Sequence, residues 1–211
     1  FMSVYNGCAT GGSALLAATY AIESGAADVA MAIGFDKHDR GSFASSPAEY
    51  GLQDWYGEAG MMVTTQFFAL KLQRYLHQYG LDKRLLSELI AKSLRNGSIT
   101  PHAWRRNPLS VEEIAEGTMV NDPLTKYMFC SPSEGGAAIV LTSTERAKQL
   151  TDRSVELRAV EFRTRKFGTF EVFSPWLAEE ITQGATVHAA KAAFETAGIG
   201  PSDVQVAQLQ D

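Results

Sequence analysis

A cysteine on a tight turn is the residue of this chain best placed for chemistry. Cys8 follows directly after the pair Asn6-Gly7, which is typical of a turn. The apolar run before it, residues 1–5, is predicted to be a strand, and the small and apolar residues 14–22 behind it are predicted to be a buried helix. Cys8 is therefore expected between the end of a strand and the start of a helix.

This position gives Cys8 two possible roles. A helix N-terminus carries about half a positive charge, which favours the thiolate form of a cysteine placed there. A thiolate at such a turn can attack a substrate and form a covalent intermediate. Free cysteine is also among the most buried residue types and often serves only as a small apolar side chain, so position alone leaves both roles open.

Composition excludes several classes of protein. The chain has 211 residues, 45% of them hydrophobic, which suits one or two globular units. Its net charge of −5 argues against nucleic-acid binding as the main task. No run approaches the ~18 apolar residues that a membrane span needs. The two cysteines, Cys8 and Cys130, are too few for a disulfide framework and have no partners at metal-ligand spacing, so we expect a reducing, cytoplasmic setting and no metal site.

Hydrophobic periodicity predicts alternating strands and helices interrupted by a long, mostly helical insertion. The chain begins inside a predicted strand, without an initiator methionine, and ends on another strand-like run, so we expect an internal piece of a longer protein. The expected strands are at residues 1–5, 29–35, 137–142, 155–162 and 204–209. The expected helices are at residues 14–22, 61–80, 82–96, 110–117 and 187–197, the third ending at Asn96-Gly97 and the fourth opening on a capping box at Ser110.

Two segments resemble those of one enzyme family. Residues 6–15, Asn-Gly-Cys-Ala-Thr-Gly-Gly-Ser-Ala-Leu, lead into a helix, a Glu-Ser-Gly turn and a strand ending Ala-Ile-Gly-Phe-Asp-Lys. This arrangement resembles the acylated-cysteine loop of the thiolase superfamily, in particular of the sterol-carrier-protein-type and lipid-transfer thiolases and of acetyl-CoA acetyltransferases. Residues 128–141 are similar to the segment through which that family returns to its core.

The resemblance implies a fold and a division into domains. The implied fold class is α/β, a thiolase-like fold of two βαβ halves with a mainly helical loop domain inserted in the first half, incomplete at both ends. The implied boundaries are residues 1–40 and 131–150 for the N-terminal half, 41–130 for the loop domain and 151–211 for the start of the C-terminal half.

The resemblance also implies roles for single residues. Cys8 matches the nucleophile that takes up an acyl group as a thioester, and the family's Gly-His-Pro and Cys-x-Gly loops are expected past Asp211. Gln210 stands where the family carries asparagine or histidine; its amide can hold an oxyanion-hole water, and an ordinary strand-end role is the equal alternative. Cys130 does not match the Cys-x-Gly loop, so we expect it to be structural.

A basic segment in the insertion is the candidate substrate contact. His102, Arg105 and Arg106 could meet the phosphates of coenzyme A, because the arginine fork suits phosphate geometry. The alternative is a solvated loop with no ligand. Coenzyme A and its acyl derivatives are expected as substrates, with no bound cofactor. His77 and His188 are expected to be plain helix residues.

The function implied by the resemblance is a thiolase-type acyl-CoA acyltransferase of lipid, steroid or fatty-acid metabolism that forms an acyl-cysteine. Two alternatives stay open. One is a thiolase-fold lyase that cleaves a steroid or other acyl-CoA by retro-aldol chemistry with a small acyl-CoA-binding partner subunit. The other is a non-catalytic scaffold that binds acyl-CoA. The family implies a homodimer or higher homo-oligomer for the full-length protein, and neither a nucleic acid nor a membrane span is expected.

The placement of the two cysteines predicts different reactivities. Cys8 opens a helix and Cys130 does not, so iodoacetamide at neutral pH should label Cys8 first in the full-length protein. Mass mapping of the labelled peptides measures this. Labelling of Cys130 with Cys8 left untouched would contradict the assignment.

Overall fold

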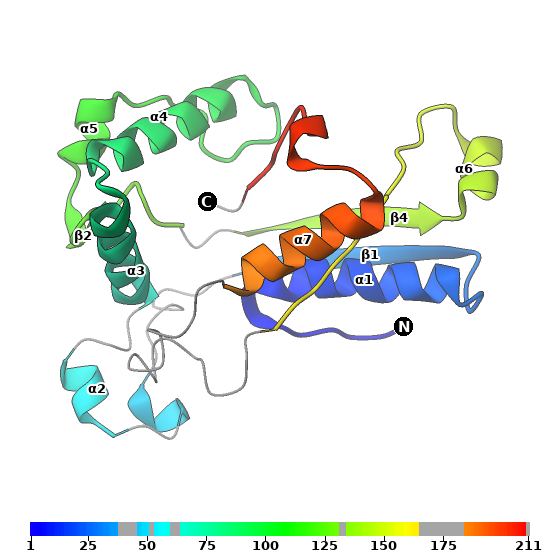
Figure 1. Ribbon diagram of the computed structural model, residues 1–211, viewed down its shortest axis with the longest axis horizontal. Helices are drawn as coiled ribbons and strands as arrows, with labels where there is room; N and C mark the ends of the chain where they lie inside the picture. Colours follow the sequence, from blue (N-terminus) through cyan, green and yellow to red (C-terminus); the bar gives the residue numbers. More distant parts are fainter. Residues whose placement is uncertain (38–45, 51–52, 60–63, 131–133, 165–183, 210–211) are drawn as a thin grey trace. The chain divides into compact units, whose positions relative to one another are not determined.

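The computed structural model describes residues 1–37, 46–50, 53–59, 64–130, 134–164 and 184–209 (Figure 1). The chain divides into two compact units. The first unit consists of Phe1–Lys37 with Ser133–Gln210, and the second of His38–Pro132 with Asp211.

The first unit is built on one pair of strands. β1 (Val29–Lys37) runs antiparallel to β4 (Glu134–Thr142), with a register from Val29 opposite Thr142 to Lys37 opposite Glu134. The Thr142 hydroxyl also donates a hydrogen bond to the carbonyl oxygen of Asp28, at 2.7 Å. This ladder pairs two segments that are far apart in the sequence. The residues between them in the chain, 38–132, belong to the second unit.

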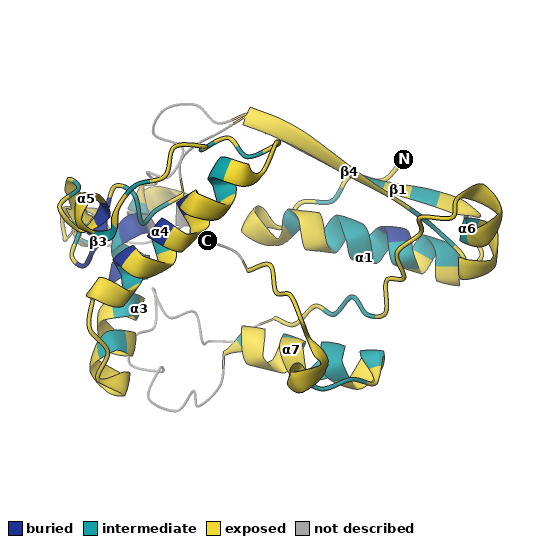
Figure 2. Cartoon of the chain, turned by 90° about the horizontal axis from the view of Figure 1, so that it is seen from above, coloured by how far each residue is buried: buried dark blue, intermediate teal, exposed yellow. Residues whose placement is uncertain are grey.

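A helix covers one face of this pair of strands. α1 (Thr10–Glu23) lies along β1 and β4, and its middle residues are buried or half-buried (Figure 2). In β1 the small side chains of Ala30 and Ala32 are half-buried, while Val29 and Met31 are exposed. Because side chains alternate between the faces of a strand, the small residues lie on the covered face and allow α1 to approach closely.

The remaining elements of the first unit follow β4. A short helix, α6 (Thr144–Leu150), begins after Ser143, whose hydroxyl oxygen accepts a hydrogen bond from the Arg146 N–H at 3.3 Å. α7 (Ala185–Ala197) ends at Gly198, which adopts the left-handed conformation with φ 66°. A 3₁₀ turn, η4 (Pro201–Asp203), comes next.

Three predicted strands are wrong. Residues 1–5, 155–162 and 204–209 form no strand among the described residues, and the helix α1 is therefore not flanked by two parallel strands there. The reason is that a strand requires a neighbour for its backbone N–H and C=O groups. In the described part of the chain β1 and β4 pair only with each other. The strand predicted at 137–142 is confirmed as part of β4.

The second unit is mainly helical. It contains the helices α3 (Thr64–Tyr79), α4 (Arg84–Ile99) and α5 (Val111–Ala115). They are followed in the chain by a small antiparallel pair of strands, β2 (Met119–Asn121) and β3 (Leu124–Thr125). Two short helical turns precede them, η2 (Pro47–Tyr50) and α2 (Trp55–Glu58). The helix predicted at 61–80 is confirmed over residues 64–79, while residues 61–63 lie outside the described residues, and the helix predicted at 110–117 is confirmed with shifted ends.

The core of the second unit is small. Ala91 and Leu94 of α4 pack against Ile114 of α5, and the buried residues gather around α4, α5 and β3 (Figure 2). The buried Thr125 hydroxyl donates a hydrogen bond to the Ile114 carbonyl oxygen at 2.7 Å. Ile114 is therefore held by apolar contacts through its side chain and by a hydrogen bond through its backbone.

The predicted end of the helix at Asn96-Gly97 is wrong. α4 continues through Gly97 to Ile99, and Thr100 is its C-cap. Glycine inside a helix costs only about 1 kcal/mol relative to alanine, so it stops a helix weakly.

Removal of the Ile114 side chain should destabilise the second unit. The side chain is 0% exposed, and Ile114→Ala should lower the free energy of unfolding by about 2–5 kcal/mol because a cavity is left behind. Leu89→Ala is the control on α4: Leu89 is 57% exposed, so the change should stay within about 0.5 kcal/mol. Urea unfolding followed by far-UV circular dichroism measures both. Equal shifts for the two variants would contradict this account of the core.

Candidate functional site

Cys8 lies on a short turn that leads into a helix. It is the middle residue of a 3₁₀ turn, η1 (Gly7–Ala9), and α1 begins at the residue that follows this turn. Gly7 has φ 51°, a conformation that side chains rarely adopt. The side chain of Cys8 is exposed. Cys8 is therefore not buried in this structure, as a cysteine that only packs in the core would be.

A set of short hydrogen bonds centred on Asn6 holds this turn. The Asn6 N–H donates to Thr10 Oγ1 at 2.8 Å, and the Asn6 side-chain amide donates to Ser13 Oγ at 2.9 Å. The Thr10 hydroxyl donates to the Gly7 carbonyl oxygen at 2.7 Å, and the Ala9 N–H donates to the Asn6 carbonyl oxygen at 3.0 Å. Both ends of the turn are thus tied to the first turns of α1.

The electrostatic setting of Cys8 is that of a helix start. Neither η1 nor the first turn of α1 contains an acidic residue. The partial positive charge of the helix N-terminus is therefore not offset from within this turn. Such an arrangement favours an anionic group bound near the start of the helix.

A second group of candidate residues lies on the loop between α4 and α5. His102 and Arg106 are exposed, and Arg105 is half-buried with its Cζ atom 5.5 Å from the centre of the Trp104 ring. Trp104 is 70% exposed. The second unit thus places the three predicted contact residues, two of them arginines, and one aromatic ring together on a single loop, which is suited to an anionic ligand.

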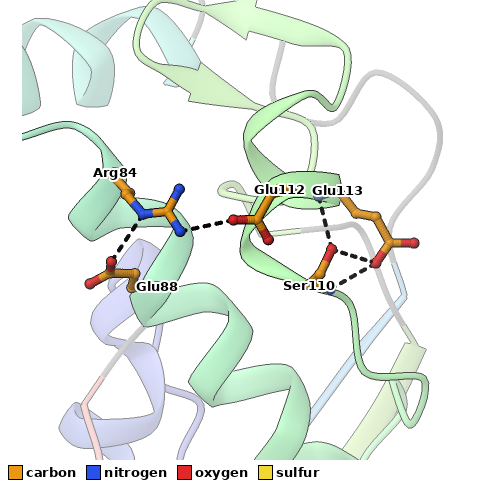
Figure 3. Close-up of polar contacts among 5 residues, drawn as sticks. All are labelled: Arg84, Glu88, Ser110, Glu112 and Glu113. Atoms are coloured by element: carbon orange, nitrogen blue, oxygen red, sulfur yellow. Dashed lines mark hydrogen bonds and ion pairs between the residues drawn. The ribbon is translucent and has the colours of Figure 1, made fainter.

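Polar contacts anchor the far end of this loop (Figure 3). The Ser110 hydroxyl oxygen accepts a hydrogen bond from the Glu113 N–H at 3.1 Å, and the Glu113 carboxylate accepts one from the Ser110 N–H at 2.8 Å. This is the capping box that the sequence predicts. Arg84 of α4 binds Glu112 of α5 at 2.8 Å and Glu88 at 3.3 Å. These contacts join α5 to the start of α4.

The same contacts shift the acidity of the groups involved. The backbone N–H of Ser110, followed by its hydroxyl, lowers the pKa of Glu113. The hydrogen bond from Arg84 is the main cause that lowers the pKa of Glu112, and the reciprocal bond raises the pKa of Arg84. All three groups stay charged at neutral pH, so they serve as anchors rather than as proton carriers.

A hollow of about 230 Å³ lies on the first unit, and sequence reasoning missed it. Its wall combines α1 with residues 157–163 and one residue of α7, Thr196. Glu161 accepts hydrogen bonds from the Thr196 hydroxyl and from Arg163 Nη1, both at 2.7 Å. These two donors, Thr196 first, lower the pKa of Glu161. Its carboxylate therefore links α7 to the extended segment.

The other candidate residues lie elsewhere. Cys130 is exposed, so access alone does not separate it from Cys8. His77 and His188 are exposed residues of α3 and α7, which confirms the prediction for both. Gln210 lies outside the described residues. Among the residues that the structure describes, no three His, Cys, Asp or Glu side chains gather as metal ligands, and no helix is long and apolar enough to cross a membrane.

Comparison with known proteins places the chain in a family. No family model matches the sequence. All of the chain aligns with "Sterol carrier protein 2" of Gallus gallus at 30% identity, and 97% of it with the "Acetyl-CoA acetyltransferase" of Methanothermobacter thermautotrophicus, also at 30%. All of it aligns at 28% identity with the "Benzoylsuccinyl-CoA thiolase subunit BbsB" of Thauera aromatica.

The chain belongs to the thiolase superfamily. It covers 40%, 52% and 53% of these three relatives, so it spans about half of their length or less. The fold has a match among solved structures in "Ltp2-ChsH2(DUF35) aldolase", with a TM-score of 0.72 and 22% identity. That match covers 92% of this chain and 51% of the other. It supports a thiolase-like α/β fold as predicted, although the strands at residues 1–5, 155–162 and 204–209 that the two βαβ halves require are not formed in this structure. The domain boundaries within the fold stay predictions.

The capping box should respond to acid. Because the folded pKa of Glu113 lies below its ordinary value of 4.5, its stabilisation of α5 is present above that value and is lost as the pH falls through the folded pKa. A ¹³C NMR titration of the Glu113 carboxyl should show the lowered midpoint. Ser110→Ala should raise the midpoint part of the way, since the backbone N–H remains, and Ser110→Thr should leave it low. An unchanged midpoint in Ser110→Ala would disprove the role of the hydroxyl.

Proposed function

We propose that the protein is a thiolase-type acyl-CoA acyltransferase in which Cys8 carries the acyl group. One observation supports this above all others. In a chain of the thiolase superfamily, Cys8 is exposed on a turn at the N-terminus of α1. A nucleophilic cysteine requires access to the substrate, and its exposed position on this turn supports the proposal.

The proposed reaction passes through a thioester on Cys8. Cys8 Sγ forms a bond to the C3 carbonyl carbon of a 3-ketoacyl-CoA, and the bond between C2 and C3 breaks with its electron pair left on C2. A proton donor then converts that fragment into acetyl-CoA. The thiol of a second coenzyme A gives up its proton, its sulfur attacks the acyl-cysteine, and Cys8 leaves as a thiolate. In the family that this chain resembles, a histidine and a second base move these protons.

The turn around Cys8 supports this step by its rigidity. Asn6 ties the residue before the turn to both Thr10 and Ser13. A nucleophile that is already held in one place loses less entropy when it meets its substrate. The negative charge that develops on the carbonyl oxygen during attack requires hydrogen-bond donors. Gln210 is proposed to hold a water for this purpose.

The cationic loop is the proposed contact for coenzyme A. A thiolase substrate carries phosphates, and His102, Arg105 and Arg106 present donors and positive charge on one loop of the second unit. Arginine suits phosphate because its planar fork matches two phosphate oxygens at once. The exposed Trp104 ring adds a flat surface on which an adenine base can stack.

One observation favours a second candidate function. A solved structure that matches the fold is named an aldolase. A thiolase-fold lyase acting on a steroid or other acyl-CoA removes a proton from a β-hydroxyl and releases a ketone or aldehyde directly, so no acyl-cysteine forms. The two-part title of that structure and the word "subunit" in the name of a relative support a partner subunit for either chemistry. A homo-oligomer and a cytoplasmic location remain proposals based on resemblance.

Trapping the intermediate separates the two chemistries. The full-length protein, mixed with acetyl-CoA or a 3-ketoacyl-CoA and quenched in acid, should carry one acyl group on the peptide that contains Cys8. Cys8→Ala should abolish both the adduct and turnover, because the residue that takes up the acyl group is gone. Mass spectrometry of the digested protein measures the adduct.

The matched control is Cys130→Ala, which removes the other exposed thiol and should leave the adduct in place. If the Cys8→Ala variant still cleaves a β-hydroxyacyl-CoA at a near-normal rate and no adduct is trapped in the parent protein, the acyltransferase proposal is wrong and the protein is a lyase. If the protein binds acyl-CoA but catalyses neither reaction, it is a non-catalytic scaffold.

A further inference from the structure

A glycine in α4 lies against the backbone of the cationic loop. A Cβ atom placed on Gly97 would lie 2.6 Å from the carbonyl oxygen of Arg105 and 3.7 Å from Cβ of Ala103. The first of these distances is too short for any side chain, and the atom in the way belongs to the backbone. Alanine at this position would therefore push the loop away from α4 or displace the helix.

The chain returns to α4 directly after the helix ends. The Thr100 hydroxyl donates a hydrogen bond to the carbonyl oxygen of Asn96 at 2.8 Å, and the Thr100 N–H donates to the carbonyl oxygen of Gly97 at 3.1 Å. The Ala103 N–H then donates to the carbonyl oxygen of Thr100 at 3.1 Å. These bonds fold residues 100–105 back onto the last turn of α4.

The other end of the loop is held as well. Leu109 packs against the cluster of Ala91, Leu94 and Ile114, and Ser110 belongs to the capping box that opens α5. The cationic residues between these two ends thus sit on a segment fixed from both sides. A charged loop that is already ordered binds its ligand with a smaller loss of entropy than a loop that must be ordered on binding.

We propose that Gly97 is a positioning residue: its missing side chain lets the backbone at Arg105 rest on α4, which presents Arg105 and Arg106 to the phosphates of coenzyme A. The inference rests on the proposed function of this loop. Glycine is otherwise a poor choice in a helix, since alanine is the better helix former. The close approach of the Arg105 carbonyl gives the physical reason for its presence in α4.

The test compares two ligands that differ in phosphate. Coenzyme A carries phosphates and pantetheine carries none. Gly97→Ala should weaken the binding of coenzyme A to the full-length protein about tenfold, the range expected when a charged hydrogen bond is misplaced, and should leave pantetheine binding unchanged. Calorimetry measures coenzyme A, and ligand-observed NMR measures the weaker pantetheine. A general loss of structure would weaken both ligands together, and that result would overturn the inference.

Two further variants keep the test decisive. Ser93→Ala changes an exposed residue of the same helix and should alter neither affinity. Thr100→Val removes the hydroxyl that bonds to Asn96 without adding a clash at Gly97. It should also weaken the binding of coenzyme A, and it serves as the test of the loop position if Gly97→Ala does not fold.

The arginines distinguish failure of the inference from failure of the proposed site. If Arg105→Ala and Arg106→Ala leave coenzyme A binding unchanged, the proposed phosphate contact is wrong, and the inference falls with it. If both arginine variants weaken binding while Gly97→Ala and Thr100→Val do not, the phosphate contact stands and the positioning role of Gly97 is disproved.

Discussion

The antiparallel pairing of β1 with β4 is the interaction on which the rest of the first unit depends. Nine residues on each strand pair in register across the whole length of the ladder. Their backbone hydrogen bonds hold β4 beside β1, although residues 38–132 of the second unit lie between the two strands in the sequence. α1 packs on the face where β1 presents small residues, and the position of α1 in turn sets the turn that carries Cys8. Loss of the ladder would therefore displace the candidate nucleophile, although no residue of the strands belongs to the site.

The second unit relies on a different balance of forces. Its core is limited to a few apolar residues around Ile114. Polar contacts at helix ends therefore contribute a larger share of the interactions that hold its helices together. The capping box at Ser110 and the contacts of Arg84 join α4 to α5, and the contact between Gly97 and Arg105 sets the loop that lies between these helices. Arg84, Ser110 and Glu112 are exposed, and their individual contacts are weak. Together they define the path of the cationic loop.

The membership in the thiolase superfamily and the local structure at Cys8 support a covalent acyl-transfer route, while the aldolase named in the matching structure keeps a second chemistry open. Both reactions act on an acyl-CoA and both suit the same cationic loop. They differ at Cys8, because only acyl transfer requires a bond to sulfur, and in the group that is deprotonated, because only the lyase removes a proton from a β-hydroxyl. The fold does not separate them, since one scaffold can carry unrelated reactions when the groups at its site change.

Local signals in the sequence determined much of this protein. The turn at Asn6-Gly7, the helix behind Cys8 and the capping box at Ser110 follow from short-range patterns that act within a few residues. The family follows from the residues around Cys8. Tertiary structure alone decided which extended segments become strands, because pairing requires a partner that is distant in the sequence. It also decided that α4 continues through Gly97: a lone glycine resembles a helix stop until the backbone packed against it is known.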